Sequence, residues 1–152
     1  MYGTPADPEA EVVAAFLREV PEIASGVIMI RALARTPGVR TKVAVDSDDA
    51  EVDFIAACGG HGGIHLRNIS DALGGEAISV TTWSPDPDMM VRHALAPLRV
   101  SRVELDERSR RARVTVPRNQ DPNILATLEG QRELAIRLSG WDIEIVMDPD
   151  LA

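Results

Sequence analysis

The sequence predicts an α+β protein made of two units that share one order of elements. Stretches with apolar residues at helical spacing alternate with short strand-like runs in the order helix–strand–strand–helix–helix–strand, and this order occurs twice in 152 residues. A proline- and aspartate-rich stretch, residues 85–88, separates the two copies. We therefore expect two domains, residues 1–84 and residues 85–152, with a boundary near Ser84.

The first unit begins with a predicted helix over residues 7–20. Asp7 is a suitable N-cap and Pro21 ends the helix, because proline cannot continue it. Two predicted strands, residues 26–34 and 41–45, enclose a Pro-Gly turn and read as a hairpin.

Two helices and a strand complete the first unit. The predicted helices cover residues 52–58 and 64–73, and four glycines interrupt the chain between them. Gly74 ends the second of these helices, and residues 76–83 read as a strand.

The second unit repeats this order after the boundary. A predicted helix is followed by two strands around a charged turn, by two short helices and by a closing strand. These elements are, in order, residues 88–96, 98–105, 112–116, 121–128, 131–138 and 142–147.

Composition and charge restrict the class of protein. The chain has a formal net charge of −8, and acidic residues outnumber basic ones by 24 to 16, which argues against strong non-specific binding to DNA. No run approaches the roughly 20 apolar residues of a membrane span, and the N-terminus lacks a secretory signal pattern. The single cysteine, Cys58, suits a reducing compartment. We expect a cytoplasmic protein that has no contact with a membrane.

The sequence offers no set of catalytic or metal-binding residues. Cys58, His61 and His65 have a spacing that zinc sites use, but no fourth ligand follows nearby, so we interpret them as a buried cysteine and two loop histidines. No histidine–acid pattern accompanies a serine, and the glycine-rich stretch lacks the Lys-Ser/Thr ending of a nucleotide-binding loop. We expect no enzyme activity, no cofactor and no metal.

Several separate segments resemble, in the same order and spacing, the paired KH domains of the NusA family of transcription factors. These segments are residues 19–45, 56–63, 74–107 and 138–145. The resemblance implies two tandem type II KH domains, each with a three-stranded sheet and helices on one face. Compared with that family, we expect a degenerate short form that lacks the N-terminal and OB-fold domains.

The resemblance also identifies a candidate RNA site. In KH domains a Gly-x-x-Gly loop clamps the nucleic-acid backbone, and here the loop keeps its glycines but has no Lys or Arg between them. The helix that follows presents its N-terminus, which favours phosphate. The expected RNA contacts are Gly60, His61, Gly62, Gly63, His65 and Arg67, with Arg31, Arg40 and Lys42 as weaker candidates on the adjoining strands.

The corresponding loop of the second domain has diverged. It falls at residues 126–129 or 127–130, and neither window holds the glycine pair, while Glu129 would repel phosphate. An arginine-rich stretch in this domain is open to two interpretations, a solvated hairpin or an auxiliary phosphate-binding strip. Its arginines are Arg99, Arg102, Arg108, Arg110, Arg111, Arg113 and Arg118.

The resemblance predicts an RNA-binding protein that acts in transcription elongation, termination or antitermination. Its expected partners are single-stranded RNA and RNA polymerase or another transcription factor. The alternative is a degenerate KH scaffold that no longer binds RNA and serves as a protein–protein interaction module. The acidic balance, Glu129 and the missing loop cation favour this alternative.

Overall fold

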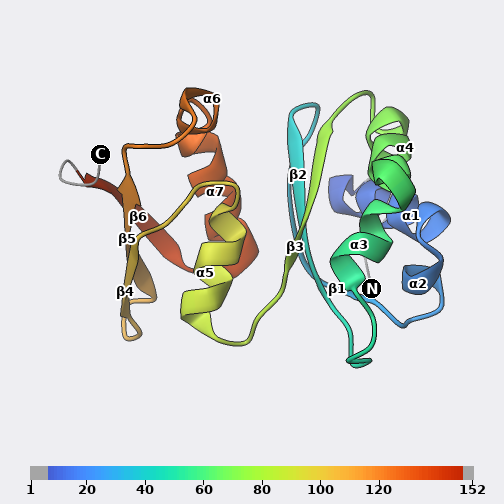
Figure 1. Ribbon diagram of the computed structural model, residues 1–152, viewed down its shortest axis with the longest axis horizontal. Coiled ribbons are helices and arrows are strands. Elements are labelled where there is room, and N and C mark those ends of the chain that lie inside the picture. Colours follow the sequence, from blue (N-terminus) through green and yellow to red (C-terminus); the bar gives the residue numbers. More distant parts are fainter. Residues whose placement is uncertain (1–6, 149–152) are drawn as a thin grey trace. The chain divides into compact units, whose positions relative to one another are not determined.

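The computed structural model describes residues 7–148, and the chain divides into two compact units, Met1–Trp83 and Ser84–Ala152. Each unit contains a three-stranded sheet with its helices on one face (Figure 1). The predicted α+β class and the repeated order of elements are confirmed.

The first unit consists of four helices, a 3₁₀ turn and three strands. They are α1 (Pro8–Glu19), α2 (Pro21–Ala24), β1 (Met29–Thr36), β2 (Arg40–Asp46), α3 (Phe54–Gly59), the 3₁₀ turn η1 (His61–Gly63), α4 (Ile64–Ala72) and β3 (Ala77–Thr82). The predicted first strand, residues 26–34, starts too early. Gly26 (φ +84°) and Ile28 close the turn after α2, where the Ile28 amide donates to the Glu22 carbonyl at 3.0 Å.

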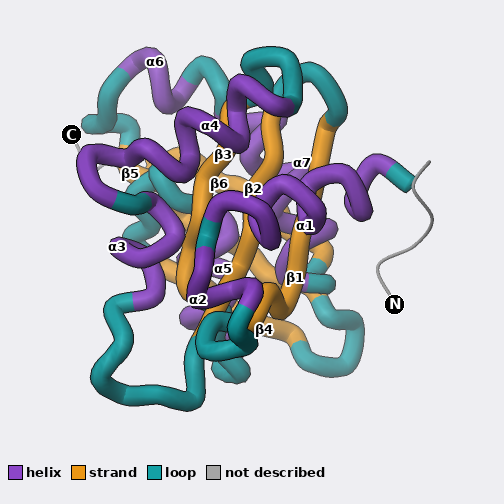
Figure 2. Tube along the Cα trace, turned by 90° about the vertical axis from the view of Figure 1, so that its right-hand side faces the viewer, coloured by secondary structure: helices purple, strands orange, loops and turns teal. Residues whose placement is uncertain are grey.

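Strand β2 lies at the centre of the first sheet, antiparallel to β1 and parallel to β3. Val43 pairs with Leu33 of β1 and with Val80 of β3, and this row points toward the helices. Figure 2 looks onto this side of the unit, where α1, α3 and α4 lie in front of the strands. The buried core between the sheet and the helices includes Val12, Phe16, Val20, Val43, Val45, Cys58 and Ile69.

The second unit repeats the topology with sheet order β4-β5-β6. Its elements are α5 (Pro87–Leu95), β4 (Arg102–Asp106), β5 (Arg111–Pro117), α6 (Pro122–Leu125), α7 (Leu128–Ser139) and β6 (Asp142–Asp148). The strand predicted over residues 98–105 begins only at Arg102. Leu98 belongs to the turn after α5, because its amide donates a hydrogen bond of 3.0 Å to the Leu95 carbonyl. Helix α7 is longer than the predicted helix over residues 131–138, and α6 is shorter than the one predicted over residues 121–128.

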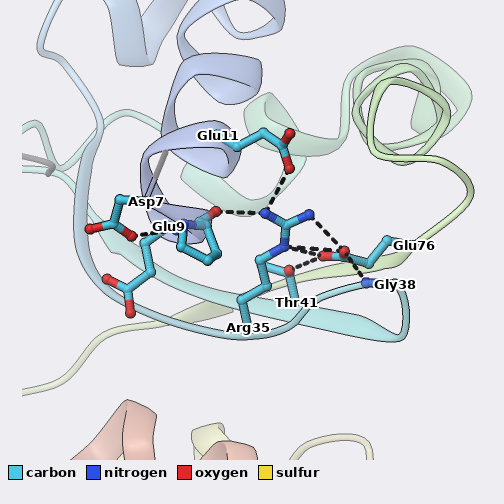
Figure 3. A network of polar contacts seen from close by, with 8 residues as sticks. Asp7, Glu9, Glu11, Arg35, Gly38, Thr41 and Glu76 are labelled. Atoms are coloured by element: carbon cyan, nitrogen blue, oxygen red, sulfur yellow. Dashed lines mark hydrogen bonds and ion pairs between the residues drawn. The ribbon is translucent and has the colours of Figure 1, made fainter. Parts of the chain in front are cut away.

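A buried ion pair between Arg35 and Glu76 joins three parts of the first unit (Figure 3). Arg35 Nη2 lies 2.9 Å from Glu76 Oε1, and the two side chains are almost completely buried. Arg35 Nη1 donates to the Pro8 carbonyl at 2.6 Å and also contacts Glu11 at 2.7 Å. The guanidinium therefore holds the first turn of α1 against β1 and the residue that precedes β3.

Glu76 receives further hydrogen bonds from the β1–β2 hairpin. The Gly38 amide donates to it at 2.9 Å, and the Thr41 hydroxyl donates to its second oxygen. Burial by itself raises the pKa of Glu76, but the hydrogen bonds from Arg35, Thr41 and Gly38 outweigh burial and leave that pKa below its usual value. The carboxylate is thus charged at neutral pH.

We expect Glu76→Gln to lower the free energy of unfolding by about 3 kcal/mol, because it leaves the buried Arg35 without its charge partner. Glu11→Gln is the matched control, since Glu11 contacts the same guanidinium but is 58% exposed, and its loss costs about 1 kcal/mol or less. Thermal and denaturant unfolding measure both effects. Equal stability of the two variants would contradict the role of this network.

The same ion pair predicts a pH dependence. Because the pKa of Glu76 is lower in the folded chain than the unfolded value of about 4.3, its stabilisation is complete above that value and is lost as the pH falls through the folded pKa. The difference in Tm between the parent protein and Glu76→Gln should therefore shrink as the pH is lowered below about 4. A difference that stays constant between neutral and acidic pH would contradict this linkage.

Candidate nucleic-acid interface

A tight glycine turn connects α3 to α4 in the first unit. Helix α3 begins at an N-cap, Asp53, whose carboxylate accepts from the Ala56 amide at 3.1 Å. The helix ends before Gly60, whose φ of 74° and ψ of 174° lie in a region that only glycine adopts readily. Gly62 (φ 63°) and Gly63 (φ 77°) are left-handed, and α4 starts directly after them. The structure thus places the loop of residues 60–63 at the N-terminus of α4.

The loop glycines differ in what surrounds them. A Cβ on Gly60 would lie 2.5 Å from Cδ2 and 2.8 Å from Cγ of His65, so the imidazole packs directly against the Gly60 backbone. A Cβ on Gly62 would meet no atom within 4 Å. Gly60 is therefore enclosed by the protein, whereas Gly62 faces open space that a ligand can approach.

Arg67 supplies a positive charge beside this open side of the loop. Its Nη1 donates to the Gly62 carbonyl at 2.5 Å and lies 3.7 Å from the position of a Cβ on Gly63. Within residues 7–148 it has no carboxylate partner. His61 is exposed in the loop itself. The loop, Arg67 and the positive end of the α4 dipole together form a surface on which a phosphate could be held.

Arg31 contacts residues of its own unit, Asp46 and Trp83, and not the loop residues. Its Nε lies 2.7 Å from Asp46 Oδ1, and its guanidinium carbon lies 5.2 Å from the centre of the Trp83 ring. The carboxylate of Asp46 offsets its charge, so Arg31 adds little to a phosphate site.

The structure does not bring Arg40 or Lys42 to the loop. Arg40 pairs with Ala77 at the start of β3, which follows the C-terminal end of α4, whereas the loop lies at the N-terminal end of that helix. Lys42 precedes Val43, whose side chain lies in the core under the helices. Because side chains alternate along a strand, Lys42 lies on the opposite face of the sheet.

The matching junction of the second unit has a different geometry. Ala126 and Thr127 connect α6 to α7 with negative φ angles, and the glycine turn is absent. Glu129 lies in the first turn of α7 and contacts Arg132 at 2.6 Å. The hydrogen bond from Arg132 lowers the pKa of Glu129, so a negative charge stands where a phosphate would have to approach.

The arginines of β5 stand between carboxylates. Side chains of its odd-numbered residues point away from the helices, because Ala112, Val114 and Val116 are buried. On that face the strand register places Arg111 between Asp106 and Asp142, and Arg113 between Glu104 and Glu144. This arrangement offsets their charge and favours the solvated hairpin over the phosphate-binding strip.

An open cleft of about 710 Å³ in the second unit is lined by residues of its three strands and of the start of α7. Carboxylates outnumber guanidinium groups along it, five to three. The charged residues that line it are Glu104, Asp106, Glu129, Asp142, Glu144, Arg111, Arg113 and Arg132. An acidic lining does not suit a phosphate backbone.

Neither a metal-binding cluster nor a membrane-spanning helix is found among the described residues. Burial raises the pKa of the Cys58 thiol to about 11, so it stays protonated and is a poor metal ligand. Among residues 7–148 no group of three His, Cys, Asp or Glu side chains is placed to hold a metal ion. None of the helices in this range is long and apolar enough to cross a membrane.

The fold and the loop define a class of protein. Each unit has the order helix–strand–strand–helix–helix–strand, with the short α2 added before β1 in the first unit. Each also has a sheet with one antiparallel and one parallel pair, and helices on one face. The first unit adds a glycine turn between its two central helices. These are the features of tandem type II KH domains.

Comparison with known proteins identifies the family. Residues 8–83 match the family described as the NusA-like first KH domain, and the chain belongs to this family. The transcription termination/antitermination protein NusA of Thermus thermophilus is 44% identical over 126 residues, which are 83% of this chain and 33% of that protein. The protein of the same name from Mycobacterium bovis is 42% identical over 132 residues, 86% of this chain and 38% of that protein.

These relatives are longer than this chain, which spans about a third of their length. Because the first unit ends at Trp83, an alignment of 126 residues extends into the second unit. The crystal structure of APE1850 has a TM-score of 0.59 at 17% identity, covers 91% of this chain and 96% of its own, and supports the fold alone.

Two residues near the loop, Glu19 and Asn68, were not predicted from the sequence. Asn68 Nδ2 donates to Glu19 Oε1 at 2.9 Å, and the same oxygen lies 3.5 Å from Nδ1 of His65. Helical spacing relates His65 to Asn68, but no spacing relates Glu19 to either of them, since their contact depends on how α1 packs against α4.

We expect Gly60→Ala to destabilise the protein by about 2–3 kcal/mol, because a Cβ there meets the His65 ring in a conformation that only glycine adopts readily. Gly59→Ala is the control. Gly59 ends α3, and its Cβ would meet nothing within 4 Å, so the change should stay within about 1 kcal/mol. Denaturant unfolding measures the loss of stability in both variants. Equal losses would refute the claim that a Cβ is excluded at Gly60 but accommodated at Gly59.

Proposed function

We propose that this protein binds single-stranded RNA through the loop of residues 60–63 and acts in transcription elongation, termination or antitermination, in the cytoplasm. One observation carries the proposal: the open Gly62 lies beside Arg67, a cation without a carboxylate partner among residues 7–148, at the N-terminus of α4. The relatives named transcription termination/antitermination protein NusA support the process.

Binding needs no covalent chemistry in this proposal, and the protein is not an enzyme. The backbone of Gly62 and Gly63 admits a phosphate close to the first amides of α4, and Arg67 supplies the charge. Ile64, the first residue of α4, is 39% exposed and offers an apolar surface to a base. His61 contributes a polar contact from the loop.

RNA polymerase or another transcription factor is the expected second partner. This part of the proposal rests on relatives that are named for transcription termination and antitermination, and the chain spans only about a third of their length. The second unit has the surface for such a contact, because its charged sheet face is exposed and does not suit RNA.

The loop proposal is tested by the pair Gly62→Asp and Gly62→Asn. Both side chains tolerate left-handed backbone and have nearly the same shape, so only the charge differs. Fluorescence anisotropy with a short random single-stranded RNA pool at about 50 and 200 mM salt gives the affinity. We expect salt-sensitive binding that Gly62→Asn retains and Gly62→Asp loses. Equal affinity of the two variants would contradict a phosphate at this position.

Arg67→Gln should weaken RNA binding and reduce the slope of log affinity against log salt by about 0.7, the change expected for one phosphate contact on a single strand. Arg40→Gln is the matched control, because Arg40 lies at the far end of α4 from the loop. Titrations at several salt concentrations measure both slopes. A larger effect of Arg40→Gln would place the RNA elsewhere.

The alternative, a protein–protein interaction module, has support from the second unit. Its junction lacks the glycine turn, and its open cleft is acidic. If the parent protein binds no RNA at high micromolar concentration, the loop proposal fails and capture of a protein partner becomes the next experiment.

A further inference from the structure

We propose that Glu19 is a positioning residue for the RNA loop and that it acts through His65. This inference rests on the proposed function of residues 60–63, and it gives His65 a different role from the direct RNA contact that the sequence predicts. Glu19, His65 and Gly60 form a chain of contacts that starts on α1, crosses to α4 and ends at the loop.

The first contact in the chain fixes the Glu19 carboxylate against α4. Asn68 Nδ2 donates to Glu19 Oε1 at 2.9 Å, and this hydrogen bond is the main reason that the pKa of Glu19 lies below its usual value. The charged oxygen is therefore held in one place on the surface of α4.

The second contact joins this oxygen to His65. Nδ1 of His65 is buried and makes no hydrogen bond, and Glu19 Oε1 lies 3.5 Å from it. Without Glu19, this buried nitrogen would lose the carboxylate that faces it, and the ring would turn toward another polar group. Asn68 and His65 lie three residues apart on α4, so one carboxylate serves both side chains.

The third contact is between the His65 ring and Gly60, so the position of the ring affects the loop. Cδ2 and Cγ of His65 lie 2.5 Å and 2.8 Å from where a Cβ of Gly60 would be. Gly60 is the residue at which the backbone leaves α3, in a conformation that only glycine adopts readily. A rotated imidazole would release this contact, and the loop would then sample other conformations. Since affinity falls with the fraction of molecules in the competent conformation, RNA binding should depend on Glu19 although Glu19 touches no RNA.

The experiment measures three quantities on each variant of the full chain. The backbone amide resonances of Gly60, Gly62 and Gly63 report the loop conformation without RNA. Anisotropy with the random RNA pool reports affinity, and thermal unfolding reports stability. The variants are Glu19→Ala, the conservative Glu19→Gln, His65→Phe, and Glu9→Ala as a control on the first turn of the same helix.

We expect Glu19→Ala and His65→Phe to shift or broaden the loop amides and to weaken RNA binding about fivefold, as when one molecule in five keeps the competent loop. Glu19→Gln should restore most of the loss, because an amide oxygen can still accept from Asn68 and present a polar atom to His65. Glu9→Ala should match the parent protein, and the Tm should change little in all four variants.

The positioning role would be refuted if Glu19→Ala left the loop amides and the affinity unchanged. It would also be refuted if Glu19→Gln were as defective as Glu19→Ala, or if the loss merely followed the Tm. The amide readout needs no RNA. Shifted amides together with a parent protein that binds no RNA would therefore uphold the positioning contact and reject the proposed function.

Discussion

The backbone reversal at Gly60 is the constraint on which the candidate site depends. Helix α3 must end and α4 must begin within four residues, and the structure achieves this with three glycines at positive φ. At Gly60 the requirement is twofold, because the conformation excludes side chains and the His65 ring occupies the space of a Cβ. The open position, Gly62, exists only because Gly60 turns the chain out of α3.

The Arg35–Glu76 ion pair stabilises the unit that contains this backbone reversal. It ties the N-terminus of α1 to the β1–β2 hairpin and to the start of β3, while the other end of α1 carries Glu19 to α4. The two ends of α1 therefore have different roles. One end is anchored by a buried ion pair that stabilises the unit, and the other contacts the helix that follows the loop. Loss of the first should cost stability, whereas loss of the second should change the loop at nearly constant stability.

Much of the fold was predictable because its signals are local. Asp7 caps α1, Pro21 begins the next short helix, and the glycines between the two central helices mark a turn that propensity alone identifies. The site was only partly predictable. That Lys42 and the loop lie on opposite sides of the sheet follows from strand register, and the contact of Glu19 with His65 follows from helix packing. Neither relation has a spacing that can be read along the chain.

The two units show what a shared topology does and does not preserve. Both keep the sheet order and the helices on one face, since these bury the core. The junction between the central helices differs, and in the second unit Ala126 and Thr127 stand in place of the glycine turn. There Glu129, which contacts Arg132, places a carboxylate in the first turn of α7, whereas in the first unit Arg67 has no carboxylate partner among residues 7–148. Because the two junctions differ in charge while both cores are kept, the proposed phosphate site belongs to the first unit alone, and the proposed protein partner would bind the second.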